Sequence, residues 1–517
     1  MCIRDRDANT AFQTRPVEIL QAALIYSFIK TFPDRATPVV HNEGHGREAW
    51  DASIDLSRTV GWFTTIWPTP AVVQPEQSLL EAVKRTKDAR RQVPRNGWEY
   101  FATKLLHSEG AQGLALPLEI VLNFAGSFHE LEDKNALFQL HETQYTRFDT
   151  AAQIPRSELF EVAAVVKQGQ LQVRISYHRH ISSERIEKWA EAFQTALEEA
   201  CHILPSTPKQ LTLADVPLLD IDYRGLDQML KQVATVFSAN IPIEIEDAYP
   251  CTGIQQGMLL SQAKNAAHYV TGTTWQVRAP GGVDRHRFLG AWQEVVQRHA
   301  ALRTIFLESH AGQVWDQVVL QSTPGHVIIL DTHGPPPAAD DVVPITPICP
   351  WHLVLHEVGD GSLTCDFRVL HALVDGVSVN LLQQQIAAAY DGKRLPQLTT
   401  GLKDYIAYVH DLPRDAATRY WANYLVGTEP CMVPNVNSDT IERGTAVKYV
   451  FRTIPCLVEL RAFCERHGVT MFNLVQLAWG LVLRAYTGVE TPCFGYLVTG
   501  RDVPVANVEQ ILSLIHI

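Results

Sequence analysis

The sequence predicts a mixed α/β protein of layered helices and sheets, built from more than one folding unit. Apolar residues repeat at helical spacing in some segments and alternate at strand spacing in others, and the two kinds of segment follow one another along the chain. A length of 517 residues exceeds what one core supports and suggests three or four folding units. With 46% hydrophobic and 19% charged residues, the composition is typical of a folded globular protein.

The chain contains an internal repeat. Residues 16–31 carry apolar side chains at helical spacing and precede a strand-like stretch at 38–40, and residues 472–502 show the same order of elements. A constant offset of 454 positions aligns the two segments without a gap, and it pairs Leu20 with Leu474, Lys30 with Arg484, Pro38 with Pro492, Gly46 with Gly500 and Arg47 with Arg501. We therefore expect two copies of one domain type, each incomplete.

The elements between the copies follow from periodicity. Residues 185–204 form an amphipathic helix that ends at Pro205, and the polar stretch after it indicates a linker over 205–244. A new unit opens at 247–262. Its predicted strands and helix are, in order, strand 275–280, helix 288–306, strand 316–321, strand 351–358 and strand 362–370.

Charge and cysteine usage exclude several classes of function. A net charge of −12 argues against a nucleic-acid partner, because phosphate backbones attract clustered Lys and Arg. The nine cysteines form no CxxC pair and lie at no metal-ligand spacing, so we expect reduced core thiols and no bound metal. Because the sequence shows neither a signal pattern nor an apolar run of about 18 residues, no membrane association is expected and a cytoplasmic location is the default.

His371 is the candidate catalytic residue of the second half. It lies where a predicted strand gives way to a predicted helix, with Asp375 and Gly376 following in the turn. Imidazole is well suited to move a proton or orient an amine at neutral pH. Because the chain has 20 histidines, spacing alone leaves open that His371 is a hydrogen-bonded structural residue.

Four motifs in order resemble those of condensation domains in nonribosomal peptide synthetases. The resemblance covers about residues 245–511, and the matching stretches are YPCTGIQQGMLLSQ, RHAALRTIF, LHALVDG and LKDYIAYV. The third resembles the family's HHxxxDG motif. The resemblance implies chloramphenicol-acetyltransferase-like lobes arranged as a V-shaped, two-lobed domain.

The same resemblance implies roles for individual residues. His371 takes the place of the second, functionally important His, whereas Leu370 stands where the family has its first. Asp375 is expected to be structural and to pair with an arginine, for which Arg303 is our candidate, with Gly376 supporting the turn. A carboxylate beside a guanidinium stays charged and fixed rather than acting as a base.

The N-terminal portion, about residues 11–204, resembles the epimerization branch of the same superfamily. The matching stretches are NEGHGRE, SRTVGWFTTIWP and VLNFAGSFHELED. The resemblance implies that Glu43 is the catalytic glutamate that exchanges the α-proton of a carrier-bound thioester, supported by Arg47. Phe124 stands where a functional tyrosine is usual.

The repeat bears on Glu43 independently of the resemblance. The position equivalent to Glu43 in the second copy is Leu497, so only the first copy has an ionisable group there. Proton exchange at carbon needs a base. Judged without the resemblance, the favoured interpretation of Glu43 is a solvated loop carboxylate in a Gly-rich turn. Because the epimerization family's own HHxxxD motif would precede this region, we expect the chain by itself not to epimerize.

These observations predict a domain order. We expect the C-terminal lobe of an epimerization domain over 1–204, a linker over 205–244, the N-terminal lobe of a condensation domain over 245–427 and an incomplete C-terminal lobe over 428–517. The hexapeptides at 1–6 and 512–517 resemble translated sequencing adapter, so we expect the natural chain to continue in both directions.

The implied function is condensation of a carrier-bound, D-terminated peptidyl or aminoacyl thioester with a carrier-bound aminoacyl amine. The resemblance implies no directly bound cofactor, because the substrates ride on the 4'-phosphopantetheine arms of carrier domains upstream and downstream, with an adenylation domain further downstream. Two alternatives stay open: a stand-alone coenzyme A-dependent acyltransferase of the same superfamily, and a non-catalytic scaffold that docks carrier domains. This polypeptide itself is expected to be poorly active.

Overall fold

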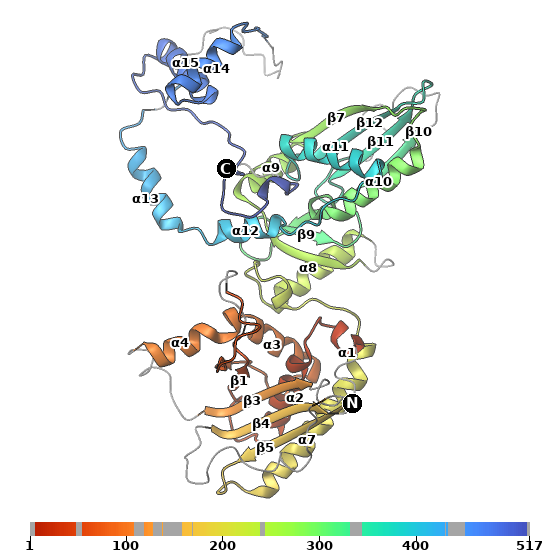
Figure 1. Cartoon of the computed structure of the whole chain (residues 1–517), viewed down its shortest axis with the longest axis vertical. Coiled ribbons are helices and arrows are strands. Elements are labelled where there is room, and N and C mark those ends of the chain that lie inside the picture. Colours follow the sequence, from red (N-terminus) through yellow and green to blue (C-terminus); the bar gives the residue numbers. More distant parts are fainter. Residues whose placement is uncertain are drawn as a thin grey trace. The chain divides into compact units, whose positions relative to one another are not determined.

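A computed structural model describes residues 6–47, 54–107, 118–127, 137, 158–167, 169–237, 243–330, 344–429, 431–432 and 450–513. The chain forms two compact units (Figure 1). Unit 1 comprises Met1–Pro250 and Phe306–Gln321, and unit 2 comprises Cys251–Ile305 and Ser322–Ile517.

Unit 1 is built on a five-stranded sheet with the order β2-β1-β3-β4-β5. The pairs β1–β3 and β3–β4 are parallel, whereas β1–β2 and β4–β5 are antiparallel. The strands are β1 Val40–Gly44, β2 Thr65–Thr69, β3 Leu118–Ser127, β4 Glu158–Lys167 and β5 Gln170–Tyr177. A mixed sheet of this kind needs helices to cover its apolar face.

Helix α2 lies at the centre of the unit 1 core. Phe28 of α2 is fully buried, and its ring meets Trp189 of α7 edge to face at a centroid distance of 5.4 Å. Trp189 also donates a hydrogen bond from its indole N–H to the Ser27 hydroxyl at 3.2 Å. The helices are α1 Arg6–Thr10, α2 Pro16–Thr31, α3 Leu79–Arg91, α4 Trp98–Leu106 and α7 Ser183–Ile203. The predicted helix at 185–204 is thus confirmed as α7.

The stretch 205–244, which the sequence indicates as a linker, is partly folded onto unit 1. It contains a short 3₁₀ turn at Leu213–Asp215 and helix α8, Tyr223–Val236. The buried Lys87 ammonium on α3 lies 2.6 Å from the Asp215 carboxylate. This ion pair anchors the start of the stretch, so the polar composition reflects specific contacts rather than a freely extended connection.

A second, three-stranded sheet follows, with the order β6-β9-β8. Its strands are β6 Ile245–Pro250, β8 Thr304–Glu308 and β9 Trp315–Leu320. The β6–β9 pair is antiparallel. β9 lies within one residue of the predicted strand at 316–321.

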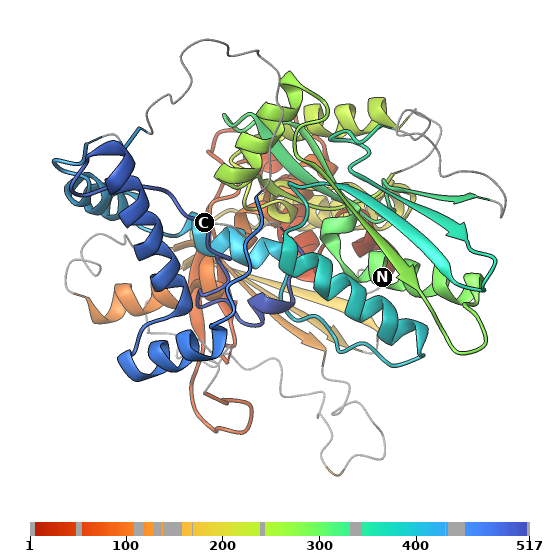
Figure 2. The ribbon, with the colours of Figure 1, turned by 90° about the horizontal axis from the view of Figure 1, so that it is seen from above.

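Unit 2 contains a four-stranded sheet with the order β10-β11-β12-β7, covered by helices α10 and α11 (Figures 1 and 2). β10–β11 is parallel and the other two pairs are antiparallel. The strands are β7 Val270–Val277, β10 His326–Leu330, β11 Trp351–Glu357 and β12 Leu363–Leu370. The helices are α9 Gly253–Lys264, α10 Arg285–Arg298, α11 Gly376–Tyr390, α12 Leu402–His410, α13 Arg414–Tyr424, α14 Leu457–His467 and α15 Met471–Thr487.

An aromatic cluster fixes α10 on the unit 2 sheet. Trp292 of α10 meets Trp351 of β11 and Phe367 of β12, each at a centroid distance of 5.4 Å. The Trp351 indole N–H also donates to the Leu302 carbonyl at 2.7 Å. Such pairs add stability beyond the area they bury, so the sheet gives a firm base for the turn that follows β12. The predicted mixed α/β class is confirmed.

The two repeat copies share backbone geometry. Gly46 and its equivalent Gly500 both adopt a left-handed conformation, with φ of 61° and 63°. Arg47 and Arg501 each donate through Nη1 to two carbonyls further along the chain. Identical special conformations at equivalent positions support the repeat seen in the sequence.

Candidate functional site

The site in unit 2 is built on the turn between β12 and α11. β12 ends at Leu370, which is fully buried and pairs with Val270 of β7. Asp375 is the N-cap of α11, and its Oδ1 accepts a hydrogen bond from the Ser378 backbone N–H at 2.7 Å. An aspartate in this position satisfies one of the unpaired N–H groups at the helix start, so the turn length between strand and helix is fixed.

His371 is the half-buried residue of this turn, between neighbours that face the core. Its backbone N–H donates to the Tyr269 carbonyl at 2.7 Å, and Tyr269 has a positive φ of 56°. The ring atom Nδ1 is enclosed and meets no hydrogen-bond partner in the described part of the chain. A non-glycine residue with positive φ stores strain that the surrounding structure must support, which indicates a turn held in one defined shape.

Asp375 is ion-paired with Arg501. Nη2 of Arg501 lies 3.2 Å from Oδ1 and 3.1 Å from Oδ2 of Asp375. The two side chains are 8% and 1% exposed. A buried carboxylate in contact with a guanidinium forms a fixed ion pair, so Asp375 is a structural residue of the turn.

Further hydrogen bonds hold Arg501 in place. Nη1 donates to the carbonyls of Val508 and Ile511 at 2.8 and 2.7 Å. Ser378 on α11 donates its hydroxyl to the Ser513 carbonyl at 2.8 Å and accepts from the Ser513 N–H at 3.0 Å. Ser513 is fully buried, although it belongs to the terminal stretch 512–517 that resembles adapter sequence.

The expected partner of Asp375, Arg303, is therefore the wrong arginine. Arg303 lies in the 3₁₀ turn Ala300–Arg303 before β8, where its side chain is 4% exposed. Arg303 belongs to the RHAALRTIF motif of the sequence. Arg501 is 126 positions from Asp375 in the sequence, a separation at which no local pattern reports a contact.

Gln255 is a site residue that the sequence reasoning did not single out. Its Nε2 donates to the Ala372 carbonyl, next to His371, at 2.9 Å, and the residue is fully buried. Gln255 also closes the capping box of α9 with Thr252. The T-x-x-Q spacing before an apolar helix was the available signal, since it marks a helix start. We infer that Gln255 positions the His371 turn.

His299, in the RHAALRTIF motif, is a buried neutral imidazole. Its side chain is 3% exposed and donates through Nε2 to the Gln385 side-chain oxygen at 2.8 Å. Burial lowers the pKa of His299 to about 4, partly opposed by the hydrogen bond to Gln385. This histidine connects the end of α10 to α11, so its role is structural.

Glu43 lies in unit 1, on β1, beside β3. Its Oε2 accepts a hydrogen bond from the Asn123 side-chain amide at 2.6 Å. Burial raises the pKa of Glu43, the Asn123 hydrogen bond acts against this, and the charge of Glu161 adds to the rise. A carboxyl group with a raised pKa is a stronger base when ionised, as proton abstraction from carbon needs. The carboxyl is therefore no freely solvated loop group.

The remaining expected residues of unit 1 have structural contacts. Arg47 donates through Nη1 to the Leu56 and Thr59 carbonyls at 2.9 and 2.6 Å, and its guanidinium lies 4.6 Å from the Phe63 ring centroid. Phe124 on β3 is partly buried against the core.

In unit 2, Gly376 is the first residue of α11, and a side chain there would meet no neighbouring atom within 4 Å.

The described residues contain neither a metal-binding cluster nor a single membrane-spanning helix. No group of three or more His, Cys, Asp or Glu side chains there is arranged to hold a metal ion. No single helix among them is long and apolar enough to cross a membrane, although α14 and α15, bent by 102° at the break between them, pass the length and composition test as a pair.

The family model described as "Condensation domain" matches residues 6–215 and 245–514. The chain is 40% identical over 518 residues to nonribosomal peptide synthetase ungA of Aspergillus violaceofuscus, covering 98% of this chain and 5% of that protein. It is 39% identical over 519 residues to nonribosomal peptide synthetase fmqA of Aspergillus fumigatus, covering 97% and 13%.

Parts of the chain resemble solved structures of low sequence identity. "The crystal structure of holo T3CT" shares 20% identity with a TM-score of 0.45, over 58% of this chain and 67% of that one. The chain spans only a small fraction of the length of the two synthetases, ungA and fmqA, that it matches. Since the family model covers most of the residues, the chain belongs to the condensation domain family.

Proposed function

We propose that this chain catalyses peptide-bond formation in nonribosomal peptide synthesis, with His371 at the reacting centre. The substrates are a peptidyl or aminoacyl thioester as donor and an aminoacyl amine as acceptor. Both are carried on the 4'-phosphopantetheine arms of carrier domains, upstream and downstream, with an adenylation domain further downstream in the parent protein. We propose that the reaction takes place in the cytoplasm.

The Asp375–Arg501 ion pair is the observation that carries the proposal. Both carboxylate oxygens of Asp375 contact Nη2 of Arg501, so Asp375 is held in place and supports the turn that carries His371. His371 is then the titratable side chain that the turn presents. Its Nδ1 is enclosed, so Nε2 is the ring nitrogen that a substrate would meet.

The reaction balances with one histidine and no added reagent. The acceptor nitrogen attacks the donor thioester carbon, the C–N bond forms, and the C–S bond breaks to release the donor carrier's thiol. His371 orients the amine or takes its proton, and the proton ends on the leaving thiolate. Bringing two tethered reactants together supplies much of the rate gain, which reaches effective molarities of about 10⁵ to 10⁸ M in well-oriented reactions.

We further propose that unit 1 is an epimerization-type copy with Glu43 as its base. The difference from Leu497 in the second copy, the raised pKa of Glu43 and its hydrogen bond to Asn123 support this role. A donor that has passed an epimerization domain ends in a D-residue, so the condensation proposed here is selective for D-terminated donors.

A transfer assay with loaded carrier domains tests the proposal. The parent synthetase is mixed with donor and acceptor carriers, and the amide product is quantified by mass spectrometry. We expect product from D-terminated donors and little from L-terminated ones. Equal use of coenzyme A thioesters would instead identify a stand-alone acyltransferase, and product formation unchanged by His371→Ala would identify a carrier-docking scaffold.

The epimerization role has a separate readout. Solvent deuterium incorporation at the α-carbon of a carrier-bound aminoacyl thioester reports proton exchange directly. In the parent synthetase we expect exchange that Glu43→Gln abolishes, while condensation of a synthetic D-terminated donor continues. Exchange that persists in Glu43→Gln would remove Glu43 from the role.

A further inference from the structure

Tyr269 combines a strained backbone with an exposed aromatic side chain next to His371. Its carbonyl accepts the His371 backbone N–H at 2.7 Å, its φ is 56°, and the residue is 46% exposed. A glycine would adopt this left-handed conformation without strain, whereas a bulky side chain there is a genuine outlier. The backbone contact with His371 therefore gives no reason for a tyrosine at this position.

The turn before Tyr269 is held by other residues. The Ala267 N–H donates to Oδ1 of Asn265 at 3.1 Å, and the His268 N–H donates to the Asn265 carbonyl at 2.9 Å. The Ser261 hydroxyl lies 3.0 Å from Nδ1 of His268. Among the described residues, the Tyr269 phenol has neither a hydrogen bond nor a ring contact. The local fold thus does not depend on this side chain.

The strand register keeps Tyr269 and His371 opposite one another. Val270, the first residue of β7, pairs with Leu370, the last residue of β12. Tyr269 and His371 lie one position beyond this pair, and their backbone hydrogen bond joins them there. Opposed residues of antiparallel strands bring their side chains within reach of each other. A group bound at the imidazole is therefore also within reach of the tyrosine ring.

Backbone strain of this kind is typical of functional positions. Such outliers persist only where the surrounding structure supports them, and they cluster at sites of binding and catalysis. The other non-glycine residues with positive φ in the described chain are Gln13, Arg95, Asn96 and Asn507. Tyr269 differs from them in being aromatic and in being bonded to the residue at the proposed reacting centre. An exposed tyrosine offers an apolar ring with a polar tip, which suits contact with an acyl group.

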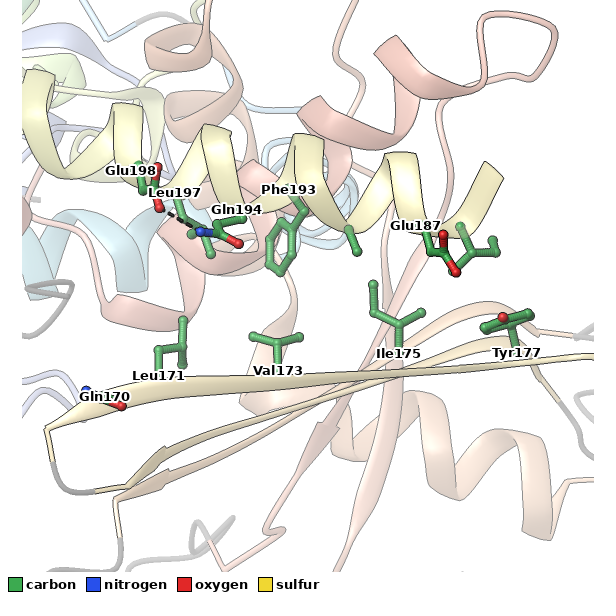
Figure 3. A pocket seen from close by; sticks show the side chains of 12 residues that line it. Gln170, Leu171, Val173, Ile175, Tyr177, Glu187, Phe193, Gln194, Leu197 and Glu198 are labelled. Carbon is green, nitrogen blue, oxygen red and sulfur yellow. Dashed lines mark hydrogen bonds between the residues drawn. The ribbon is translucent and has the colours of Figure 1, made fainter. Parts of the chain in front are cut away.

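A groove of about 650 Å³ between β5 and α7 in unit 1 offers no comparable contact (Figure 3). Its β5 side carries a row of side chains that point toward α7, namely Leu171, Val173, Ile175 and Tyr177. The lining of this groove includes no histidine and no residue with positive φ. It therefore lacks the imidazole that the proposed reaction uses.

We propose that the Tyr269 side chain contacts the amino-acid side chain of the carrier-bound substrate at His371 and so determines which substrates are accepted. This inference rests on the proposed function in peptide-bond formation. The ring provides apolar contact area, and the gain from this contact grows with the size of the substrate side chain. The preferred substrates are therefore bulky and apolar, and a glycyl substrate gains little.

The kcat/KM for amide formation in the parent synthetase tests this. One series uses a D-leucyl donor with an L-leucyl acceptor, and the other uses glycyl groups on both carriers. Tyr269→Gly removes the side chain and the strain but keeps the carbonyl that holds His371. We expect kcat/KM to fall about tenfold in the leucyl series and less than about twofold in the glycyl series. Tyr269→Phe keeps the ring and should stay within about twofold of the wild type in both.

Two controls separate this inference from the proposed function. Gln13→Gly relieves the strain of a φ of 50° in unit 1 and should leave both rates unchanged. Hydrogen exchange at the His371 amide should be no faster in Tyr269→Gly than in the wild type. Equal falls in the two series, wild-type rates in both, or faster exchange at the His371 amide would overturn the substrate contact and leave the proposed function standing. An unchanged rate in His371→Ala would instead overturn the proposed function, and this inference with it.

Discussion

The guanidinium of Arg501 contacts both carboxylate oxygens of Asp375, with Nη2 at 3.2 Å from Oδ1 and 3.1 Å from Oδ2. The two residues are 126 positions apart in the sequence, and both are nearly fully buried. Asp375 also caps α11, so one carboxylate sets the helix start and is itself held by a distant arginine. The ion pair and the helix cap together fix the position of the turn that carries His371.

Substitutions at Asp375 should separate its two contributions. Asp375→Asn keeps an N-cap acceptor but leaves the Arg501 charge buried and unpaired. We expect the free energy needed to open β12 and α11 locally to fall by about 3–5 kcal/mol. Asp375→Ala also removes the cap and should lose about 1 kcal/mol more. Hydrogen exchange of the α11 and β12 amides measures both losses. Equal protection in wild type and Asp375→Asn would contradict the role of the ion pair.

Gln255 should act on rate through the position of His371. Gln255→Ala removes the hydrogen bond to the Ala372 carbonyl and leaves a buried carbonyl unpaired, at a cost of about 1–3 kcal/mol. Because no substrate contact is lost, kcat for peptide transfer should fall while KM for the loaded carriers stays within about twofold. Gln293→Ala on the exposed side of α10 is the control and should match the wild type. A change in KM alone would show that Gln255 does not position the turn.

The low pKa of His299 predicts that the stability of unit 2 depends on pH. Its pKa is about 4 in the folded state and near 6.5 when unfolded. As the pH falls below 6.5 the unfolded chain takes up a proton before the folded one, so stability is lost progressively down to pH 4. The expected loss is about 3 kcal/mol.

Urea denaturation at several pH values checks this expectation. His299→Gln preserves a hydrogen-bonding side chain toward Gln385 but does not titrate, so the difference in stability between wild type and variant should shrink from pH 7 to pH 4. A difference that stays constant over this range would show that His299 is not the titrating group.

Gly46 should be intolerant of a side chain. Its φ is 61°, and a Cβ there would lie 1.6 Å from the Phe63 carbonyl oxygen. Gly126 has a φ of 72° but open space around the equivalent atom. Gly126→Ala should therefore cost only the conformational strain of about 1–2 kcal/mol, whereas Gly46→Ala should cost clearly more. Thermal unfolding of the two variants side by side makes the comparison, and equal effects would contradict the close approach.

Local patterns in the sequence predicted most of the site scaffold. Alternation located β12, and the strand end followed by a helix start placed His371 in the turn. Local patterns could not predict that Arg501 pairs with Asp375, because this contact depends on how the chain between the two residues folds. The repeat offered an indirect signal, since Arg47 and Arg501 are equivalent and make equivalent carbonyl contacts.

Burial of the repeated helix also depends on tertiary context. Ile25 and Phe28 of α2 are fully buried beneath the five-stranded sheet and α7. Their equivalents on α15, Trp479 and Val482, are 50% and 43% exposed. The apolar pattern is the same in both helices, so the sequence indicates a core helix twice, whereas the described residues supply covering strands for the first copy only.

The most direct measurement is the single-turnover rate of amide formation between a donor and an acceptor on loaded carrier domains, in the parent synthetase carrying His371→Ala. We expect a fall of about 10²-fold or more with α11 exchange protection unchanged. His410→Ala, at an exposed position on α12, should retain the wild-type rate. An unchanged rate in His371→Ala would contradict the assignment of this imidazole to peptide-bond formation.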